Sequence, residues 1–207
     1  MATAVKICGI TRPVDAHAAA RSGAHALGFV FYRKSPRNIE VSRAAELVQE
    51  LPPFVTAVGL FVNPAVREVE NVLENVHLHL LQFHGDEPPE FCAQFGTPYI
   101  KAARVKAGLD LLQYSQRYKT ARGLLLDAFV EGTHGGTGTG FDWNLIPRGL
   151  SLPLILSGGL TGRNVADAIR RVAPWAVDVS SGVEASPGIK DAGKIAEFMK
   201  EVRSADV

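Results

Sequence analysis

The stretch Val55-Thr56-Ala57-Val58-Gly59-Leu60-Phe61-Val62 is a continuous, mostly apolar run rich in β-branched residues. A second run of this kind, Ala26-Leu27-Gly28-Phe29-Val30-Phe31, lies upstream. A strand with one exposed face alternates apolar and polar residues, whereas a strand covered on both faces is apolar throughout. The two runs therefore predict parallel strands packed between layers of helices.

Similar runs recur along the chain and alternate with helical patterns. Strands are expected near 4–8, 26–31, 55–62, 78–83, 98–103, 123–127, 153–157 and 175–180. Helical patterns lie between them at 14–21, 42–51, 65–74, 88–95, 109–118, 163–172 and 192–202, with only a short segment near 141–146 after the sixth strand. Asn63-Pro64 reads as the cap-and-proline start of the helix at 65–74.

This alternation predicts an α/β protein folded as a single-domain (β/α)8 TIM barrel over residues 1–207, with a repeat of about 25 residues. The length of 207 residues suits one well-buried core and is short for two domains. A doubly wound open sheet would show the same alternation. Regular units without a further domain favour the closed barrel, whose active site forms at the C-terminal ends of the strands.

Bulk composition argues against several classes of partner. Lys and Arg total 22 against 21 Asp and Glu, which gives no electrostatic reason to expect nucleic acid or an anionic membrane. The N-terminus lacks the apolar stretch of a signal peptide, and no apolar run approaches the ~18 residues of a membrane span. We expect a cytoplasmic protein without nucleic-acid or membrane partners, either a monomer or a homodimer.

Metal binding is not expected from the sequence. Cys8 and Cys92 are far apart, and His77 and His79 show no ligand spacing with Cys or carboxylates. Cys92 falls in the predicted helix 88–95, where a small buried hydrophobic residue is the better interpretation.

Two candidate proton-transfer groups end predicted strands. Cys8 closes Val5-Lys6-Ile7-Cys8, where the nearby Lys6 would favour partial thiolate character and make the thiol a usable base. Asp127 closes Leu124-Leu125-Leu126, where partial burial would push its pKa toward that of a general acid. The alternatives are a small buried residue for Cys8 and a loop-capping carboxylate for Asp127.

Three glycine-containing loops follow the last three strands and suit a phosphate group. The first holds Gly136 and Gly138 within residues 135–140, the second is Ser157-Gly158-Gly159, and the third is Ser180-Ser181-Gly182. Glycines let backbone N–H groups approach an anion closely, and barrel phosphate sites are often built from the loops after strands seven and eight. We therefore predict a phosphate site there.

Arg37 and His84 also follow predicted strands. Arg37 could hold a substrate carboxylate through paired N–H donors, or it could be a solvated surface arginine. His84 could hydrogen-bond a substrate, or it could be a structural histidine bonded to its own loop.

Taken together, the motifs resemble the phosphoribosylanthranilate isomerase family. The matching stretches span nearly the whole chain and include Lys6-Ile7-Cys8-Gly9-Ile10-Thr11, Leu81-Gln82-Phe83-His84-Gly85, Leu156-Ser157-Gly158-Gly159-Leu160, Val177-Asp178-Val179-Ser180-Ser181-Gly182-Val183-Glu184 and Pro187-Gly188-Ile189-Lys190-Asp191. Ser157 stands where the family more often has Ala, and Ala128 stands where Ser or Thr is common.

The resemblance implies an Amadori rearrangement of N-(5-phosphoribosyl)anthranilate without metal or organic cofactor. By resemblance, Asp127 would protonate the furanose ring oxygen, Cys8 would remove the C2′ proton, and Arg37 would hold the anthranilate carboxylate. The substrate would be a phosphorylated small molecule. Its remaining contacts would come from His84, Asp178 and the three glycine-containing loops.

Four rival functions remain. A histidine-pathway isomerase would carry Asp at the first strand end, where this chain has Cys8. Indole-glycerol-phosphate synthase would need catalytic lysines at strand ends and a longer N-terminal extension, and a barrel aldolase would need a Schiff-base lysine. A non-catalytic sugar-phosphate binding module would have no need of both Cys8 and Asp127.

Overall fold

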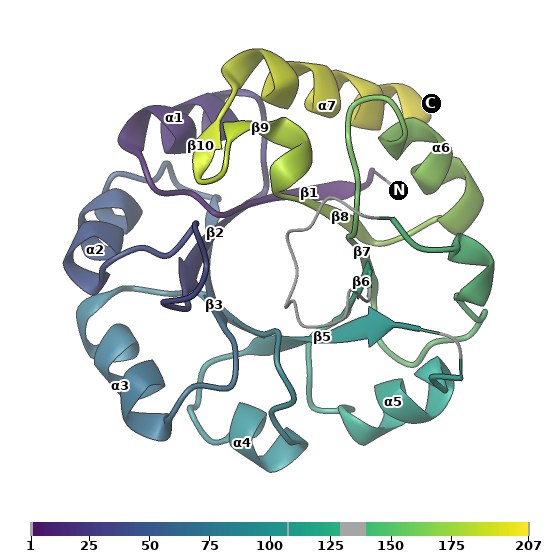
Figure 1. Cartoon of the computed structure of the whole chain (residues 1–207), viewed down its shortest axis with the longest axis horizontal. Helices are drawn as coiled ribbons and strands as arrows, with labels where there is room; N and C mark the ends of the chain where they lie inside the picture. The colour runs from purple at the N-terminus through teal and green to yellow at the C-terminus, as the bar shows by residue number, and fades with distance from the viewer. Residues whose placement is uncertain (1, 107, 129–139, 207) are drawn as a thin grey trace.

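Eight parallel strands close into a barrel in the computed structural model, which describes residues 2–106, 108–128 and 140–206. Each strand pairs with its neighbours in chain order, and the last pairs with the first (Figure 1). The strands are β1 (Ala4–Cys8), β2 (Ala26–Phe31), β3 (Thr56–Phe61), β4 (Leu80–Phe83), β5 (Tyr99–Val105), β6 (Leu124–Ala128), β7 (Leu154–Leu156) and β8 (Ala176–Val179). The closed barrel is confirmed, and the open doubly wound sheet is excluded.

Helices surround this ring of strands on the outside (Figure 1). They are α1 (Pro13–Arg21), α2 (Val41–Gln49), α3 (Val66–Asn75), α4 (Pro89–Ala93), α5 (Leu111–Arg117), α6 (Val165–Val172) and α7 (Ala192–Ala205). Between β6 and β7 the described residues form only the short 3-10 helix η1 (Trp143–Leu145), in the place where the sequence predicts a short segment.

The core lies on both sides of the strands, as their continuous hydrophobicity predicts. Five of the six residues of β3 are buried, because one face contacts the barrel interior and the other the surrounding helices. Phe29, Phe61 and Phe83 are among the largest fully buried side chains. Such packing removes a large apolar area from water, which is the main favourable contribution to folding.

Two local features differ from the sequence interpretation. The start of α3 was predicted wrongly at Asn63-Pro64, because Ala65 is the N-cap residue and Asn63 takes a left-handed φ of 46°. The Asn63 side chain instead accepts a hydrogen bond from the backbone N–H of Asp86 at 2.7 Å. Its role is to join two loops at the ends of β3 and β4.

The chain after β8 also forms structure that no strand pattern indicated. The 3-10 helix η2 (Ser181–Val183) leads into a short antiparallel hairpin of β9 (Glu184–Ser186) and β10 (Ile189–Lys190). In the chain this hairpin comes between β8 and α7, and in space it lies beside α1, where the backbone N–H of Lys190 donates to Asp15 (Figure 1). Within the described part of the chain, no helix has the length and apolar character needed to cross a membrane.

Candidate active site

The Cys8 thiol ends β1 in a buried position beside a buried ion pair. Lys6 Nζ donates to Asp178 Oδ1 at 2.7 Å, and Lys6, Asp178 and Cys8 are each at most 5% exposed as residues. In the register of the sheet, Lys6 pairs with Asp178 on β8 and Cys8 pairs with Gly28 on β2. A Cβ at Gly28 would lie 2.8 Å from Cys8 Sγ and 3.1 Å from Lys6 Cε, so the thiol and the lysine both occupy space that a glycine leaves open.

Burial and charge act on Cys8 in opposite directions. Burial raises the pKa of the thiol, while Lys6 lowers it through charge and hydrogen bonding and Lys190 lowers it further; the net pKa lies above the ordinary value. Burial alone would lower the pKa of Lys6, but Asp178 and Cys8 outweigh it and raise that pKa to about 12. Lys6 is therefore a permanent cation beside the thiol at neutral pH.

Asp127, on β6, is buried and hydrogen-bonded on both oxygens. The backbone N–H of Ala128 donates to Oδ1 at 2.9 Å, and Oδ2 lies 3.1 Å from His84 Nε2. The other ring nitrogen, His84 Nδ1, lies 2.9 Å from Gln82 Nε2, so the imidazole is hydrogen-bonded on both nitrogens and joins Gln82 to Asp127. His84 thus bonds both Gln82, two residues earlier in the chain, and the candidate acid on β6.

The segment after β7 joins these two groups. Ser157 Oγ donates to Asp178 Oδ2 at 3.4 Å, on the Cys8 side. A Cβ at Gly158 would lie 3.1 Å from Asp127 Oδ1 and 2.8 Å from Ala128 N, on the other side. The segment after β7 therefore contacts Asp178 through Ser157 and passes close to Asp127 at Gly158.

Arg37 is buried and ion-paired, so its interpretation as a solvated surface arginine is wrong. Its Nε and Nη2 donate to the two carboxylate oxygens of Glu184 at 2.8 and 2.7 Å. Its aliphatic part crosses Gly9, where a Cβ would come within 2.6 Å of Arg37 Cδ. The guanidinium is thus held close to the end of β1, the strand that carries Cys8.

The predicted phosphate loops lie next to the proton-transfer groups where the structure describes them. Gly158 and Gly159 have φ values of 86° and 66°, which favour glycine. Ser180 Oγ donates to the backbone carbonyl of Cys8 at 3.0 Å, and Ser181 and Gly182 form η2. Gly136 and Gly138 lie outside the described residues.

Close packing explains the glycine at position 182. A Cβ there would lie 1.9 Å from the carbonyl oxygen of Leu160, so the loops after β7 and β8 touch backbone to backbone. The two loops that were expected to share a phosphate group are therefore adjacent.

Sequence reasoning assigned no role to Gln82, Glu184 or Lys190, all of which are at most 6% exposed. Glu184 and Lys190 lie in the unpredicted hairpin, where Lys190 Nζ donates to Glu184, the partner of Arg37. Their only signal was their place in stretches that match the family. In the described ranges 2–106, 108–128 and 140–206, no group of three or more His, Cys, Asp or Glu side chains is arranged to hold a metal ion.

Cys92 lies away from this site. It is a free cysteine on α4 with no exposed surface, as predicted for a buried small residue, and burial raises the pKa of its thiol to about 12.

Comparisons with known proteins agree with these motifs. The family model described as N-(5′-phosphoribosyl)anthranilate (PRA) isomerase matches residues 5–201. The N-(5′-phosphoribosyl)anthranilate isomerase of Nitrosospira multiformis is 60% identical over 202 residues, which cover 98% of this chain and 97% of the relative.

Solved structures give the same result. The crystal structure of phosphoribosyl anthranilate isomerase from Thermotoga maritima is 44% identical, with a TM-score of 0.89 and coverage of 98% of this chain and 99% of that one. A crystal structure of such an isomerase in complex with reduced 1-(o-carboxyphenylamino)-1-deoxyribulose 5-phosphate is 43% identical, with a TM-score of 0.87 and the same coverage. The chain belongs to the N-(5′-phosphoribosyl)anthranilate isomerase family.

Proposed function

We propose that this chain is an isomerase of tryptophan biosynthesis that converts N-(5-phosphoribosyl)anthranilate to 1-(2-carboxyphenylamino)-1-deoxyribulose 5-phosphate. The observation that carries the proposal is the pair of buried proton-transfer groups at the ends of β1 and β6. Cys8 lies beside the Lys6 cation, Asp127 is hydrogen-bonded to His84, and the segment after β7 lies close to both Asp178 and Asp127.

The reaction begins at Asp127. Its carboxyl group donates a proton to the furanose ring oxygen, the C1′–O bond breaks, and the anthranilate nitrogen becomes a protonated Schiff base. His84 Nε2 then donates to the carboxylate that remains, which stabilises the charge that develops there.

Cys8 completes the rearrangement. Its thiolate removes the C2′ proton, and the electron pair moves toward the Schiff-base nitrogen to give a neutral enolamine, which tautomerises to the ketone product. Lys6 stabilises the thiolate before the transfer. Each proton-transfer group contributes about 10²–10⁴-fold to the rate.

Binding is divided between the two ends of the substrate. Arg37 holds the anthranilate carboxylate, whereas Gly136, Gly138, Gly158, Gly159, Ser180, Ser181 and Gly182 hold the phosphate through the three loops. Asp178 and His84 lie beside the reacting carbons. We propose one catalytic domain over residues 1–207, active as a monomer or homodimer in the cytoplasm, with a small molecule as its partner and no nucleic acid.

The test is an assay on freshly prepared N-(5-phosphoribosyl)anthranilate without added metal, which follows the loss of anthranilate fluorescence. The parent chain is expected to turn over, and Cys8→Ala and Asp127→Asn are each expected to lose at least about 100-fold in kcat. The matched controls are Cys92→Ala and Asp167→Asn, of a buried thiol on α4 and an exposed carboxylate on α6.

Two results would contradict the proposal. A folded parent chain that leaves the substrate unchanged would move the assignment to another phosphoribosyl substrate, with the histidine-pathway intermediate assayed next. Full activity of Cys8→Ala would remove the thiol from the mechanism even if the parent is active.

A further inference from the structure

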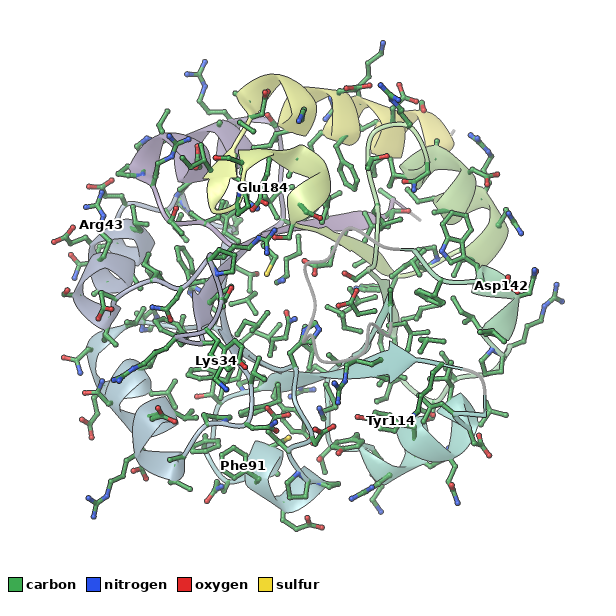
Figure 2. All side chains as sticks on the ribbon, viewed as in Figure 1. Lys34, Arg43, Phe91, Tyr114, Asp142 and Glu184 are labelled. Carbon is green, nitrogen blue, oxygen red and sulfur yellow. The ribbon has the colours of Figure 1, made fainter. Side chains whose placement is uncertain are left out.

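The β9–β10 hairpin brings two charged side chains into the interior of the protein. Glu184 is 6% exposed and Lys190 is 4% exposed, although both lie on short strands outside the barrel. Figure 2 shows Glu184 inside the ring of helices, whereas Arg43 extends outward from α2. A buried charge lowers the stability of a protein unless it is paired, so we expect both side chains to have charged partners.

Glu184 fixes the plane of the Arg37 guanidinium. Two parallel hydrogen bonds from Nε and Nη2, at 2.8 and 2.7 Å, form a bidentate pair across 147 positions of sequence. A guanidinium has five N–H donors in a planar fork, and this pairing occupies one edge of it. The direction of the other edge is therefore determined by Glu184.

Lys190 supplies a second cation to the same carboxylate. Its Nζ donates to Glu184 Oε1 at 2.8 Å and to the Ser180 carbonyl and hydroxyl oxygens at 3.1 and 3.3 Å. Three acceptors match the three N–H donors of an ammonium group. Burial raises the pKa of Glu184, but its bonds to Arg37 and Lys190 outweigh that effect and keep the net pKa below the ordinary value.

The charges in this cluster do not cancel. Counted over these three described side chains alone, Arg37 and Lys190 are the cations and Glu184 is the anion between them, so the three carry one net positive charge. Burial lowers the pKa of Lys190, and its bond to Glu184 opposes that effect. A neutral Arg37–Glu184 pair would offer little attraction to an anionic substrate group. Lys190 keeps the net charge of the three side chains positive, while Glu184 fixes the orientation of the Arg37 guanidinium.

We propose that Glu184 is a positioning residue that orients Arg37 for the substrate carboxylate, with Lys190 keeping the cluster net positive. This inference rests on the proposed function, in which Arg37 binds the anthranilate carboxylate. Ser180 bonds both Lys190 and the backbone of Cys8, so the cluster is also anchored to the strand that carries the base.

The test compares Glu184→Gln with Glu46→Gln in the same fluorescence assay. Glu46 also pairs with an arginine, Arg43, but on the exposed face of α2. Glu184→Gln is expected to raise KM about 10- to 100-fold, the range for losing a hydrogen-bonded charged contact, and to lower kcat less than about threefold. Glu46→Gln is expected to change neither value.

A double-mutant cycle separates positioning from a general structural role. If Glu184 acts through Arg37, Glu184→Gln adds less than about threefold to the KM of Arg37→Met. If the two effects on KM multiply fully, the proposal is overturned. Glu184→Asp keeps the charge on a shorter side chain and is expected to raise KM less than Glu184→Gln, which keeps the test available if the amide variant does not fold.

A probe without the carboxylate completes the design. Ribulose 5-phosphate carries the phosphate but no anthranilate group, so its inhibition constant is expected to be the same for the parent and Glu184→Gln. An equal loss for probe and substrate would mean general damage to the site, and a fall in kcat without a rise in KM would mean an action on the base. Either result overturns the inference, whereas an inactive parent chain overturns the proposed function instead.

Discussion

The Cys8 thiol lies where burial and charge pull its pKa in opposite directions. Burial raises this pKa, and the adjacent Lys6 is the largest influence that lowers it. A base must be deprotonated to act, so activity is lost as the pH falls through its pKa. The charge of Lys6 therefore sets how far toward neutral pH the proposed enzyme remains active.

Lys6→Met is expected to move the acid limb of the kcat/KM profile to higher pH. Loss of the cation leaves burial and Asp178 unopposed by Lys6, and both raise the pKa of the thiol. Activity at neutral pH then falls, while activity in alkaline solution is largely retained. The measurement is a profile of kcat/KM from about pH 6 to pH 10.

Two controls accompany that profile. Lys200→Met removes a lysine from the exposed side of α7 and is expected to leave the profile unchanged. Lys6→Arg keeps a cation and is expected to shift the acid limb less. A Lys6→Met profile that lies on the parent curve would show that the lysine does not act on the base.

At the scale of elements, the loop after β7 passes close to the proposed acid at Gly158, where there is no room for a side chain. A Cβ at this position would lie 3.1 Å from Asp127 Oδ1, and its φ of 86° is strained for any other residue. Gly149 has almost the same φ, 84°, yet a Cβ there would meet no described atom within 4 Å. Substitutions at the two positions therefore distinguish the effect of backbone strain, which both share, from displacement of Asp127, which only Gly158 would cause.

Gly158→Ala is expected to lower kcat by about 10- to 100-fold, because small displacements of a reacting group have large effects on rate. Gly149→Ala is expected to lower stability by about 1–2 kcal/mol through the same left-handed strain but to leave kcat unchanged. Thermal unfolding and steady-state kinetics of both variants provide the comparison. Equal kcat values for the two variants would contradict the displacement of Asp127.

The elements themselves could be predicted largely from the sequence, since each β and α pattern is local. The continuous run around β3 identified a strand covered on both faces, and the alternation identified the barrel. The prediction was wrong at Asn63 because its side chain accepts a hydrogen bond from the loop after β4 and does not cap the helix. Local patterns do not distinguish these two uses.

The site could be predicted only in part for the same reason. Cys8 and Asp127 could be proposed as candidates because each closes a predicted strand. The pairing of Arg37 with Glu184 was not, since the two lie 147 positions apart and the hairpin that carries Glu184 has too few residues to show a period. Long-range ion pairs are products of the fold and leave no periodic signal.

At the scale of the whole molecule, one buried lysine supports the barrel. Lys101 has no exposed surface, and its Nζ bonds Glu87 and the carbonyl oxygens of Phe83, Gly85 and Ala102. Its amine is therefore fully engaged and is not available as the Schiff-base lysine that an aldolase would need. The contacts tie β5 to the end of β4.

Lys101→Met is expected to lower the free energy of unfolding by about 3–5 kcal/mol, because it leaves Glu87 as a buried charge without its cation. Urea denaturation measures this loss, with Lys119→Met, of an exposed lysine, as the control. The folded fraction of the Lys101→Met protein is expected to keep the kcat of the parent. A large fall in kcat under conditions in which all of the variant protein is folded would assign Lys101 a part in the chemistry.

The first and last parts of the described chain are bonded to each other. The backbone N–H and the hydroxyl of Thr3 donate to the carboxylate of Asp206 at 2.9 and 2.7 Å. Because the two parts lie side by side, they can be joined and the chain opened at another place without changing the order of the strands around the barrel. A short linker between the ends, with the chain opened beside the fully exposed Phe54, is expected to give a circular permutant that folds to the same barrel and retains its kcat/KM within about threefold, as circular dichroism and the fluorescence assay would show.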